Sequence, residues 1–297
     1  LIMYFLIYFF FICFFTNFLI KYSIPLMGKI FKEIPNERSS HKKTKLKSGG
    51  IFFILIILIS NIIFITFKGS SEISQIIFIC SLLSLIGLAD DLFYLSSKIR
   101  YFLHIIFSFL IVNTVHPFLV FDQNYIVLIA LIFLGTLIIN FINFIDGIDG
   151  LLIGCSIPIL IFNQINSFNI QIITAIAGML AFLKWNWTPS KIFMGDCGSN
   201  YLGGLIFFCI LSKGEYLIDF KIIFITLPIL LDCSMCIVKR FLNKENIFIA
   251  HKKHLYQRLH QGGMSHGNVS FIYIILCLAN FLICFQNNLN IFICLVF

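Results

Sequence analysis

The 297-residue chain is 60% hydrophobic, only 11% of its residues are charged, and its formal net charge is +8. Ordinary soluble domains have about a quarter of their residues charged, and a soluble fold of this composition would expose far too much apolar surface. A mean hydropathy of +1.00 therefore excludes an ordinary soluble protein and indicates that lipid is the solvent for most of the chain.

Ten apolar runs follow one another, most of them about long enough to cross a membrane as helices. They are residues 1–20, 51–67, 73–89, 101–116, 124–144, 151–166, 171–187, 201–213, 221–239 and 270–287. The first run has no basic leader or small-residue cleavage site, so we interpret it as a retained helix. A short run at 289–297 would make eleven. Because only helices satisfy the backbone in lipid at this length, we expect an all-α integral membrane protein with a single domain over residues 1–297.

Basic residues divide the connections between these runs into two unequal sets. Eighteen of the 21 Lys and Arg residues lie in one set, which comprises residues 21–50, 90–100, 145–150, 184–200 and 239–269. By the positive-inside rule this set is cytoplasmic, which places the N-terminus outside. The basic face would meet anionic lipid or an anionic substrate, and no motif indicates a nucleic-acid partner.

Two adjacent acids, Asp90 and Asp91, follow the third apolar run. Neighbouring carboxylates repel each other unless a cation lies beside them, and a negative charge at a helix C-terminus opposes the helix dipole. A functional role is therefore favoured over a solvated helix end.

The densest polar segment is Asn140-Phe-Ile-Asn-Phe-Ile-Asp-Gly-Ile-Asp-Gly150. Asn140 and Asn143 lie three residues apart on a predicted helix and share a face. Asp146 extends that face, and Asp149 continues it if the helix persists. Oxygen ligands at this spacing suit a hard cation or sugar hydroxyl groups. The alternative is a polar seam between helices.

A third polar segment is Phe193-Met-Gly-Asp-Cys-Gly-Ser-Asn200, in another connection of the basic set. It predicts a tight turn whose N–H groups face a phosphate at the start of the next helix, and Asp196 adds an oxygen ligand. Such residues also form ordinary turns. The segment gains weight because it lies on the same membrane face as the other two.

Two connections are candidates for binding anionic groups. The last large one contains His251-Lys-Lys-His-Leu-Tyr-Gln-Arg258, which suits a pyrophosphate or a lipid phosphate; a headgroup-binding stretch is the alternative. The first contains Pro35-Asn-Glu-Arg-Ser-Ser-His41 and then four lysines, for which lipid anchoring is the stronger interpretation. Together with the acids, these groups indicate a divalent cation that neutralises a nucleotide pyrophosphate.

Most of the ten cysteines lie in apolar runs, where a free thiol behaves as a small hydrophobe. Cys233 and Cys236 form a C-x-x-C pair. No second Cys or His pair accompanies it at ligand spacing, so the support for a metal or redox site is weak. Asp232, beside this pair, is the one acid well inside a span, and we expect it to pair inward or to reach the site.

Four polar segments, in their order along the chain, resemble the polyprenyl-phosphate N-acetylhexosamine-1-phosphate transferase family, also called glycosyltransferase family 4. They are the Asp90-Asp91 pair, residues 140–150, residues 193–200 and the last, histidine-containing connection. The set covers most of the chain, and it is specific only as a set. The resemblance implies a transmembrane transferase with ten or eleven helices and a cytoplasmic active site in a bacterial inner membrane. It also implies Mg²⁺ dependence, with Mn²⁺ as an alternative. The implied reaction transfers a sugar 1-phosphate from a UDP-sugar to undecaprenyl phosphate and releases UMP.

The resemblance also implies roles for single residues. Asp90 is the candidate base or lipid-phosphate partner, and the candidate catalytic set is Asp90, Asp91, Asp146 and Asp149. The expected metal ligands are Asp91, Asp146 and Asp196. The expected substrate-binding residues are Asn140, Asn143, Lys98, Arg100, His251, His254, Arg258 and His41.

The His251-Lys-Lys-His254 form departs from the compact triple-His run of the enzymes of peptidoglycan precursor synthesis. It looks closer to the enzymes that start O-antigen or other surface glycans, the WecA and WbpL types. The expected donor is therefore a UDP-N-acetylhexosamine, with GlcNAc, FucNAc and QuiNAc left open, and a homodimer is compatible with it. Lys45 and Leu46 stand where the family often has a proline-containing stretch.

An ion-coupled transporter is the rival prediction from another class, because acids within membranes often mark ion paths. Transporters place such acids near the midplane on broken helices, whereas here they lie at helix ends and in connections. A helix bundle without catalysis is the third alternative.

Overall fold

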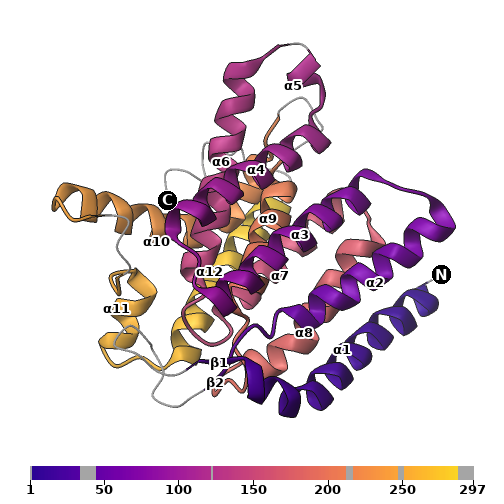
Figure 1. Cartoon of the computed structure of the whole chain (residues 1–297), viewed down its shortest axis with the longest axis horizontal. Coiled ribbons are helices and arrows are strands. Elements are labelled where there is room, and N and C mark those ends of the chain that lie inside the picture. Colours follow the sequence, from indigo (N-terminus) through magenta and orange to yellow (C-terminus); the bar gives the residue numbers. More distant parts are fainter. Residues whose placement is uncertain (1, 34–44, 122, 212–216, 247–250, 287–297) are drawn as a thin grey trace.

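The computed structural model of this chain is almost entirely helical (Figure 1). It describes residues 2–33, 45–121, 123–211, 217–246 and 251–286. The helices are α1 (Ile2–Ile30), α2 (Ile51–Lys68), α3 (Glu72–Phe93), α4 (Ser97–Val115), α5 (Phe118–Phe121), α6 (Tyr125–Ile145), α7 (Leu151–Asn166), α8 (Ile170–Asn186), α9 (Gly195–Ile210), α10 (Phe220–Leu242), α11 (Leu255–Gln261) and α12 (His266–Phe285). Two short strands, β1 (Lys32–Glu33) and β2 (Lys45–Leu46), pair antiparallel.

Each of the ten predicted apolar runs corresponds to a helix. Among the described residues, seven helices are long and apolar enough to cross a membrane, namely α1, α2, α3, α4, α6, α10 and α12. Helices α7 and α8 are apolar but shorter. An all-α integral membrane protein is thus supported, while the total of ten or eleven crossings stays a prediction. The run at 289–297 lies outside the described residues.

Helix α9 differs most from the prediction, because it begins at Gly195 and not near residue 201. The segment expected to form a tight turn instead makes the first turns of the helix. The carboxylate of Asp91 accepts hydrogen bonds from the amides of Asp196 and Cys197 at 3.1 and 3.4 Å. A carboxylate in this position satisfies N–H groups that have no partner within the helix and complements the helix dipole. Two amides of the segment predicted to face a phosphate, those of Asp196 and Cys197, therefore face Asp91.

Helix α9 lies at the centre of the bundle, with α3, α6 and α7 packed on it (Figure 1). Its contact with α3 depends on Gly87, where a Cβ atom would collide with the backbone of Asp196. A Cβ atom at Gly203 would likewise meet the backbone of Ile139 in α6. Glycine allows these close approaches because it has no side chain. The end of α3 and the start of α9, which carry the acids, are thereby brought into contact.

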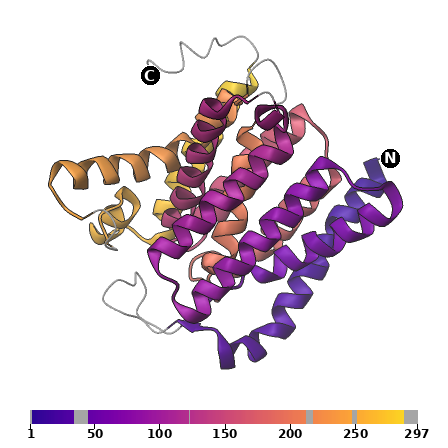
Figure 2. The same cartoon turned by 45° about the horizontal axis from the view of Figure 1, so that its top comes forward.

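Two peripheral helices present apolar side chains outward. Helix α1 lies at the edge of the bundle beside α2 and α8 (Figure 1) and exposes Phe10 and Phe14. Helix α10, which contains Pro228, extends sideways from the bundle (Figure 2). Its Phe241 and Leu242 are exposed. Exposed apolar surface of this extent is expected where lipid is the solvent.

A backbone strap holds the end of the first connection against the segment that precedes α9. The amide of Phe193 donates to the carbonyl of Leu46, and the amides of Gly49 and Gly50 donate back to that segment, at 2.7–2.9 Å. Residues 45–48 are at least half-buried. Lys45 and Lys47, which the sequence interpretation assigned to a lipid anchor, therefore point into the protein.

Candidate active site

Two carboxylates, from α3 and α9, face each other at one end of the bundle. Asp90 is buried in the last turn of α3, whereas the side chain of Asp196, in the first turn of α9, is 25% exposed. The two side chains share a hydrogen bond. Two carboxylates this close repel each other unless a proton or a cation lies between them. The Asp90–Asp196 pair is therefore a place where a cation would relieve repulsion.

Arg100 and Asn143 are polar neighbours of this pair. Arg100 lies in the first turn of α4, and its Nη1 atom is 3.0 Å from Asp90 Oδ2 and 3.8 Å from Asp196 Oδ2. Asn143 donates to Asp196 Oδ1 at 3.2 Å and to Ser199 Oγ at 2.9 Å. The arginine joins α3, α4 and α9 at the pair, and the asparagine fixes the orientation of Asp196.

Asp91 lies beside the pair, but protein groups already surround its carboxylate. Lys47 Nζ lies 2.8 Å from Oδ1, and Ser48 Oγ donates to Oδ2 at 2.7 Å. The amides of Asp196 and Cys197 complete the set. Asp91 thus ties the strap and the start of α9 to α3. To bind a metal, as predicted, it would have to give up one of these donors.

Asp149 is also buried among donors, which come from β2, the segment after α8, and α12. They are Lys45 Nζ at 3.2 Å, Ser190 Oγ at 2.7 Å, the Ser190 amide at 3.1 Å, Thr188 Oγ1 at 3.1 Å and His266 Nδ1 at 3.5 Å. Burial by itself would raise the pKa of Asp149. The hydrogen bonds from His266 and Ser190 and the charge of Lys45 outweigh burial and hold that pKa below its usual range. Asp149 is thus an ionised anchor for three segments.

Asn140 and Asn143 share a face of α6, as predicted. Asn143 contacts Asp196, whereas Asn140 donates to the carbonyl of Thr136 in its own helix at 2.7 Å. Because α6 ends at Ile145, Asp149 does not continue this face.

Asp146 caps α6, one turn beyond Asn143, and is partly buried. A Cβ atom at the adjacent Gly147 would collide with the hydroxyl of Tyr256, which donates to the carbonyl of Phe144 at 3.0 Å. The end of α6 therefore packs against α11. This contact brings Asp146 to the side of the histidine-containing connection.

That connection is fixed to α10 through Asp232. His254 Nδ1 lies 3.2 Å from Asp232 Oδ1. The amides of Leu255 and Tyr256 donate to the same carboxylate at 2.8 and 3.1 Å, and the hydroxyl of Tyr273 donates at 2.5 Å. Asp232 therefore pairs inward, which is one of the two outcomes expected for it.

His251 stacks on His254, with ring centroids 5.0 Å apart. Burial lowers the pKa of His251 to about 4, and the positive charges of Arg240 and Lys253 act in the same direction. At neutral pH this ring is therefore uncharged. It is suited to accept or donate single hydrogen bonds and is not a permanent cation.

Three further residues were predicted to bind substrate. Lys98 and Arg258 are exposed, on the first turn of α4 and on α11. Lys98 lies two residues before Arg100, so the two side chains do not share a helix face. His41 lies outside the described residues.

Lys45 and Lys47 are site residues that the sequence interpretation assigned to lipid. Each reaches a buried carboxylate, Lys45 at Asp149 and Lys47 at Asp91. The two lysines lie two positions apart at β2, and alternate residues of an extended segment share a face. This alternation was a signal that the stretch faces one partner surface.

Known proteins resemble this chain over most of its length. A model of the family described as glycosyl transferase family 4 matches residues 73–213, which contain the acids of α3, the end of α6 and the start of α9. The chain is 33% identical to a phospho-N-acetylmuramoyl-pentapeptide-transferase of Dictyoglomus thermophilum, over 71% of this chain and 75% of that protein. It is 28% identical to a probable undecaprenyl-phosphate N-acetylglucosaminyl 1-phosphate transferase of Bacillus subtilis, over 81% of this chain and 73% of that protein. This chain therefore belongs to glycosyl transferase family 4, the family of the polyprenyl-phosphate hexosamine-1-phosphate transferases.

Proposed function

We propose that this chain transfers an N-acetylhexosamine 1-phosphate from a UDP-sugar to undecaprenyl phosphate, releases UMP and so starts a surface glycan such as O-antigen. Family membership supports phospho-sugar transfer. One observation carries the proposal for the site: Asp90 and Asp196 face each other beside Arg100. Carboxylates and a guanidinium together suit a cation and an anionic diphosphate.

In the proposed reaction, an oxygen of the lipid phosphate attacks the β-phosphorus of the UDP-sugar. A new P–O bond forms to the lipid, the bond from the β-phosphorus to the bridging oxygen breaks, and UMP leaves with that electron pair. A phosphate monoester has its second pKa near about 6, so the nucleophile is already largely dianionic at neutral pH. Asp90 therefore acts by orienting the lipid phosphate or taking its last proton, and a strong base is not required.

Arg100 is the residue proposed to meet the diphosphate. Its Nε is buried and has no hydrogen-bond partner among the described residues. A buried donor without a partner costs free energy, and a guanidinium matches the geometry of phosphate oxygens. A phosphate oxygen at Nε would satisfy this nitrogen, while Nη1 keeps its contact with Asp90.

A divalent cation, Mg²⁺ with Mn²⁺ as a substitute, fits the same pair. Hard carboxylate oxygens of Asp90 and Asp196 are the donors such a cation prefers, and it would take the place of the proton that the two side chains share. When bound there, Mg²⁺ neutralises charge on the diphosphate and on departing UMP. In this proposal Asp91 supports the site by fixing the start of α9. The proposed metal ligands, Asp90 and Asp196, therefore differ from the ligand set predicted from the sequence, which was Asp91, Asp146 and Asp196.

Two classes of sugar donor are candidates. The relative from Bacillus subtilis is named for N-acetylglucosamine, and that from Dictyoglomus thermophilum for the N-acetylmuramoyl pentapeptide. The spacing of His251 and His254 favours GlcNAc or a 6-deoxy relative such as FucNAc or QuiNAc. The 33% identity to the second relative favours the muramoyl pentapeptide, which is the second candidate function.

We propose a cytoplasmic site in a bacterial inner membrane, with the N-terminus outside, because 18 of the 21 Lys and Arg residues lie in the connections of one face. The acids lie at the ends of α3 and α6 and at the start of α9. A transporter would place them near the midplane, so this position favours the transferase.

The test is a panel of UDP-sugars with undecaprenyl phosphate and the purified protein in detergent. UDP-GlcNAc, UDP-FucNAc, UDP-QuiNAc and UDP-MurNAc-pentapeptide are compared for UMP release and for label extracted into lipid, with Mg²⁺, Mn²⁺ or EDTA. We expect product with metal and an N-acetylhexosamine donor. Product from the pentapeptide donor alone would select the second candidate, and UMP release from none of the donors would overturn the proposal.

The matched variants are Asp196→Asn and Asp219→Asn. Asp219 caps α10 by accepting from the amides of Lys221 and Ile222, and asparagine is an equally good cap. We expect Asp219→Asn to keep transfer and Asp196→Asn to lose it.

A further inference from the structure

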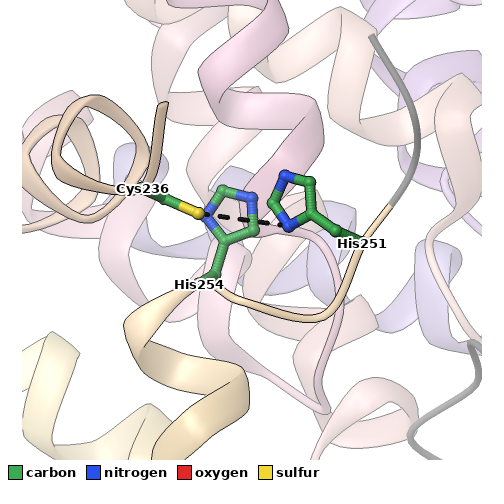
Figure 3. A group of neighbouring side chains, drawn as sticks. All are labelled: Cys236, His251 and His254. Carbon is green, nitrogen blue, oxygen red and sulfur yellow. Dashed lines mark hydrogen bonds between the residues drawn. The ribbon is translucent and has the colours of Figure 1, made fainter. Parts of the chain in front are cut away.

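A second group of metal-ligand side chains lies on α10 and the histidine-containing connection (Figure 3). Cys236, His251 and His254 each offer one ligand atom, and these atoms all lie within 4.8 Å of one another. Cys236 Sγ is 4.0 Å from His251 Nδ1. Cys236 and His254 are buried and His251 is half-buried. The fold thus assembles one sulfur and two nitrogen donors in a place that the chemistry proposed above does not use for its cation.

Cys233, the first cysteine of the C-x-x-C pair, does not point at these two histidines. Cys233 Sγ donates to the carbonyl of Phe141 in α6 at 3.4 Å. The cluster is therefore not built from the C-x-x-C pair, and its histidines lie at least 15 residues further along the chain. This separation explains why residue spacing supported a metal site only weakly.

His254 has the hydrogen-bond arrangement of a metal-binding histidine. Its Nδ1 lies 3.2 Å from Asp232 Oδ1, which leaves Nε2 for a ligand. A histidine that binds a metal usually donates its other ring N–H to a carboxylate or a carbonyl, which fixes the tautomer and the ring. Asp232 precedes Cys236 by one turn of α10, so the carboxylate and the thiol share a helix face. The carboxylate is itself held by the Tyr273 hydroxyl.

We propose that Cys236, His251 and His254 bind Zn²⁺, with Asp232 orienting His254. One thiolate and two imidazoles are donors that zinc prefers, with Zn–S near about 2.3 Å and Zn–N near about 2.0–2.1 Å. Such bonds place tetrahedral donor atoms about 3.4–3.6 Å apart. The fourth tetrahedral position is left for water or an anion.

The charges around the cluster suit one added divalent cation. Arg240 and Lys253 come near, but both pair with Glu245, at 3.2 and 2.6 Å. Asp232 contributes a negative charge. The amide of Lys253 donates to His251 Nδ1 at 3.2 Å. Zinc bound at Nδ1 would replace this hydrogen bond.

Zinc at this site would tie the connection before α11 to α10. His251 and His254 are also the residues expected to face substrate phosphates, so the metal would fix their positions and compete with an anion for them. Zinc binding itself does not depend on the proposed transferase chemistry. It is therefore tested without any sugar substrate.

The test uses Co²⁺ as a spectroscopic substitute for Zn²⁺ on the purified full chain, reduced and in detergent. We expect one equivalent of Co²⁺ to give tetrahedral d–d bands and a thiolate-to-cobalt charge-transfer band, both removed by Zn²⁺. Cys236→Ala should lose the charge-transfer band. Cys233→Ala, a buried thiol on the same helix, is the matched control and should keep it. Asp232→Asn should weaken Zn²⁺ affinity by about 10- to 100-fold.

A further variant separates loss of a ligand from misfolding. Cys236→His exchanges a sulfur donor for a nitrogen donor, so it should still bind one equivalent of Co²⁺ without the charge-transfer band. Asp196→Asn should keep the band, because the Asp90–Asp196 pair is a separate site. A band that persists in Cys236→Ala, or its absence from the unmodified chain at saturating Co²⁺, would overturn the proposal.

Discussion

Asp149 and the Asp90–Asp196 pair are buried or half-buried acids at the same end of the bundle, yet their surroundings are opposite. Asp149 accepts from Lys45, Ser190, Thr188 and His266, and burial does not prevent its ionisation. In the pair, two carboxylates face each other beside Arg100, and Asn143 donates to Asp196. A carboxylate surrounded by donors is satisfied within the protein, whereas two facing carboxylates require an added proton, cation or substrate. Unmet charge, and not burial, therefore marks the place for chemistry.

The largest effect is expected from neutralising the pair. Asp196→Asn or Asp90→Asn should lower transfer by about 10²- to 10³-fold, because the group that would hold the cation is lost. The same change should leave the thermal midpoint unchanged or raise it, because it also removes repulsion between carboxylates. UMP release and thermal unfolding in detergent measure the two effects. A strongly destabilised Asp196→Asn variant would show that the pair is an anchor like Asp149.

Neutralising Asp149 should have the opposite signature. Asp149→Asn should destabilise the protein by about 3–5 kcal/mol, because it leaves the charge of Lys45 without its partner. Unfolding monitored in detergent checks this value, with Asp219→Asn as the control for loss of a carboxylate. Unchanged stability together with lost transfer would show that Asp149 takes part in the reaction and is not a structural anchor.

The contact that assembles the pair should be sensitive to one methyl group. Gly87→Ala places a Cβ atom against the backbone of Asp196, so α3 and α9 must separate at a cost of about 1–3 kcal/mol, and transfer should fall with it. Gly28→Ala is the control, since its Cβ would make only an ordinary contact with Leu46, at 3.9 Å. Equal stability of the two variants would contradict the close packing of α3 on α9.

The smallest effect concerns pH and the histidine-containing connection. The pKa of His251 is lowered to about 4 in the folded protein, against about 6.5 in an unfolded chain. The unfolded state therefore binds more protons between these values. Stability is fully present above about pH 6.5 and should fall as the pH drops towards 4. Thermal midpoints in EDTA-containing buffers measure this slope, which His251→Asn should flatten; an unaltered slope in that variant would assign it to another group.

Much of the fold could be predicted because its causes are local. Each predicted apolar run is helical, since a run of apolar residues in lipid has few alternatives to a helix. Helix α11 was missed because it is only Leu255–Gln261 within a basic connection, and its start depends on Asp232 in α10. Helix α9 was placed too late because its start depends on Asp91 in α3. Both errors occur where a carboxylate distant in the sequence caps a helix.

The candidate site was predictable as a set of residues but not as an arrangement. Asp90, Asp91 and Asp196 stood out as acids beside apolar runs. Their different surroundings did not, because Lys47 and the amides of α9 reach Asp91 only after the helices pack. The cluster around Cys236 could not be predicted either, because its two histidines come from a separate connection.

Hydropathy and residue pattern are enough to predict a membrane-embedded helix bundle, and the order of the polar segments indicates the family. Hydrophobicity and residue spacing are properties of neighbouring residues, so a single chain reveals them. Which acids are neutralised and which face each other depends on helix packing, which the pattern of residues does not show. Electrostatic energy depends on the distance between groups and on the surrounding medium, and both are set by how the helices pack.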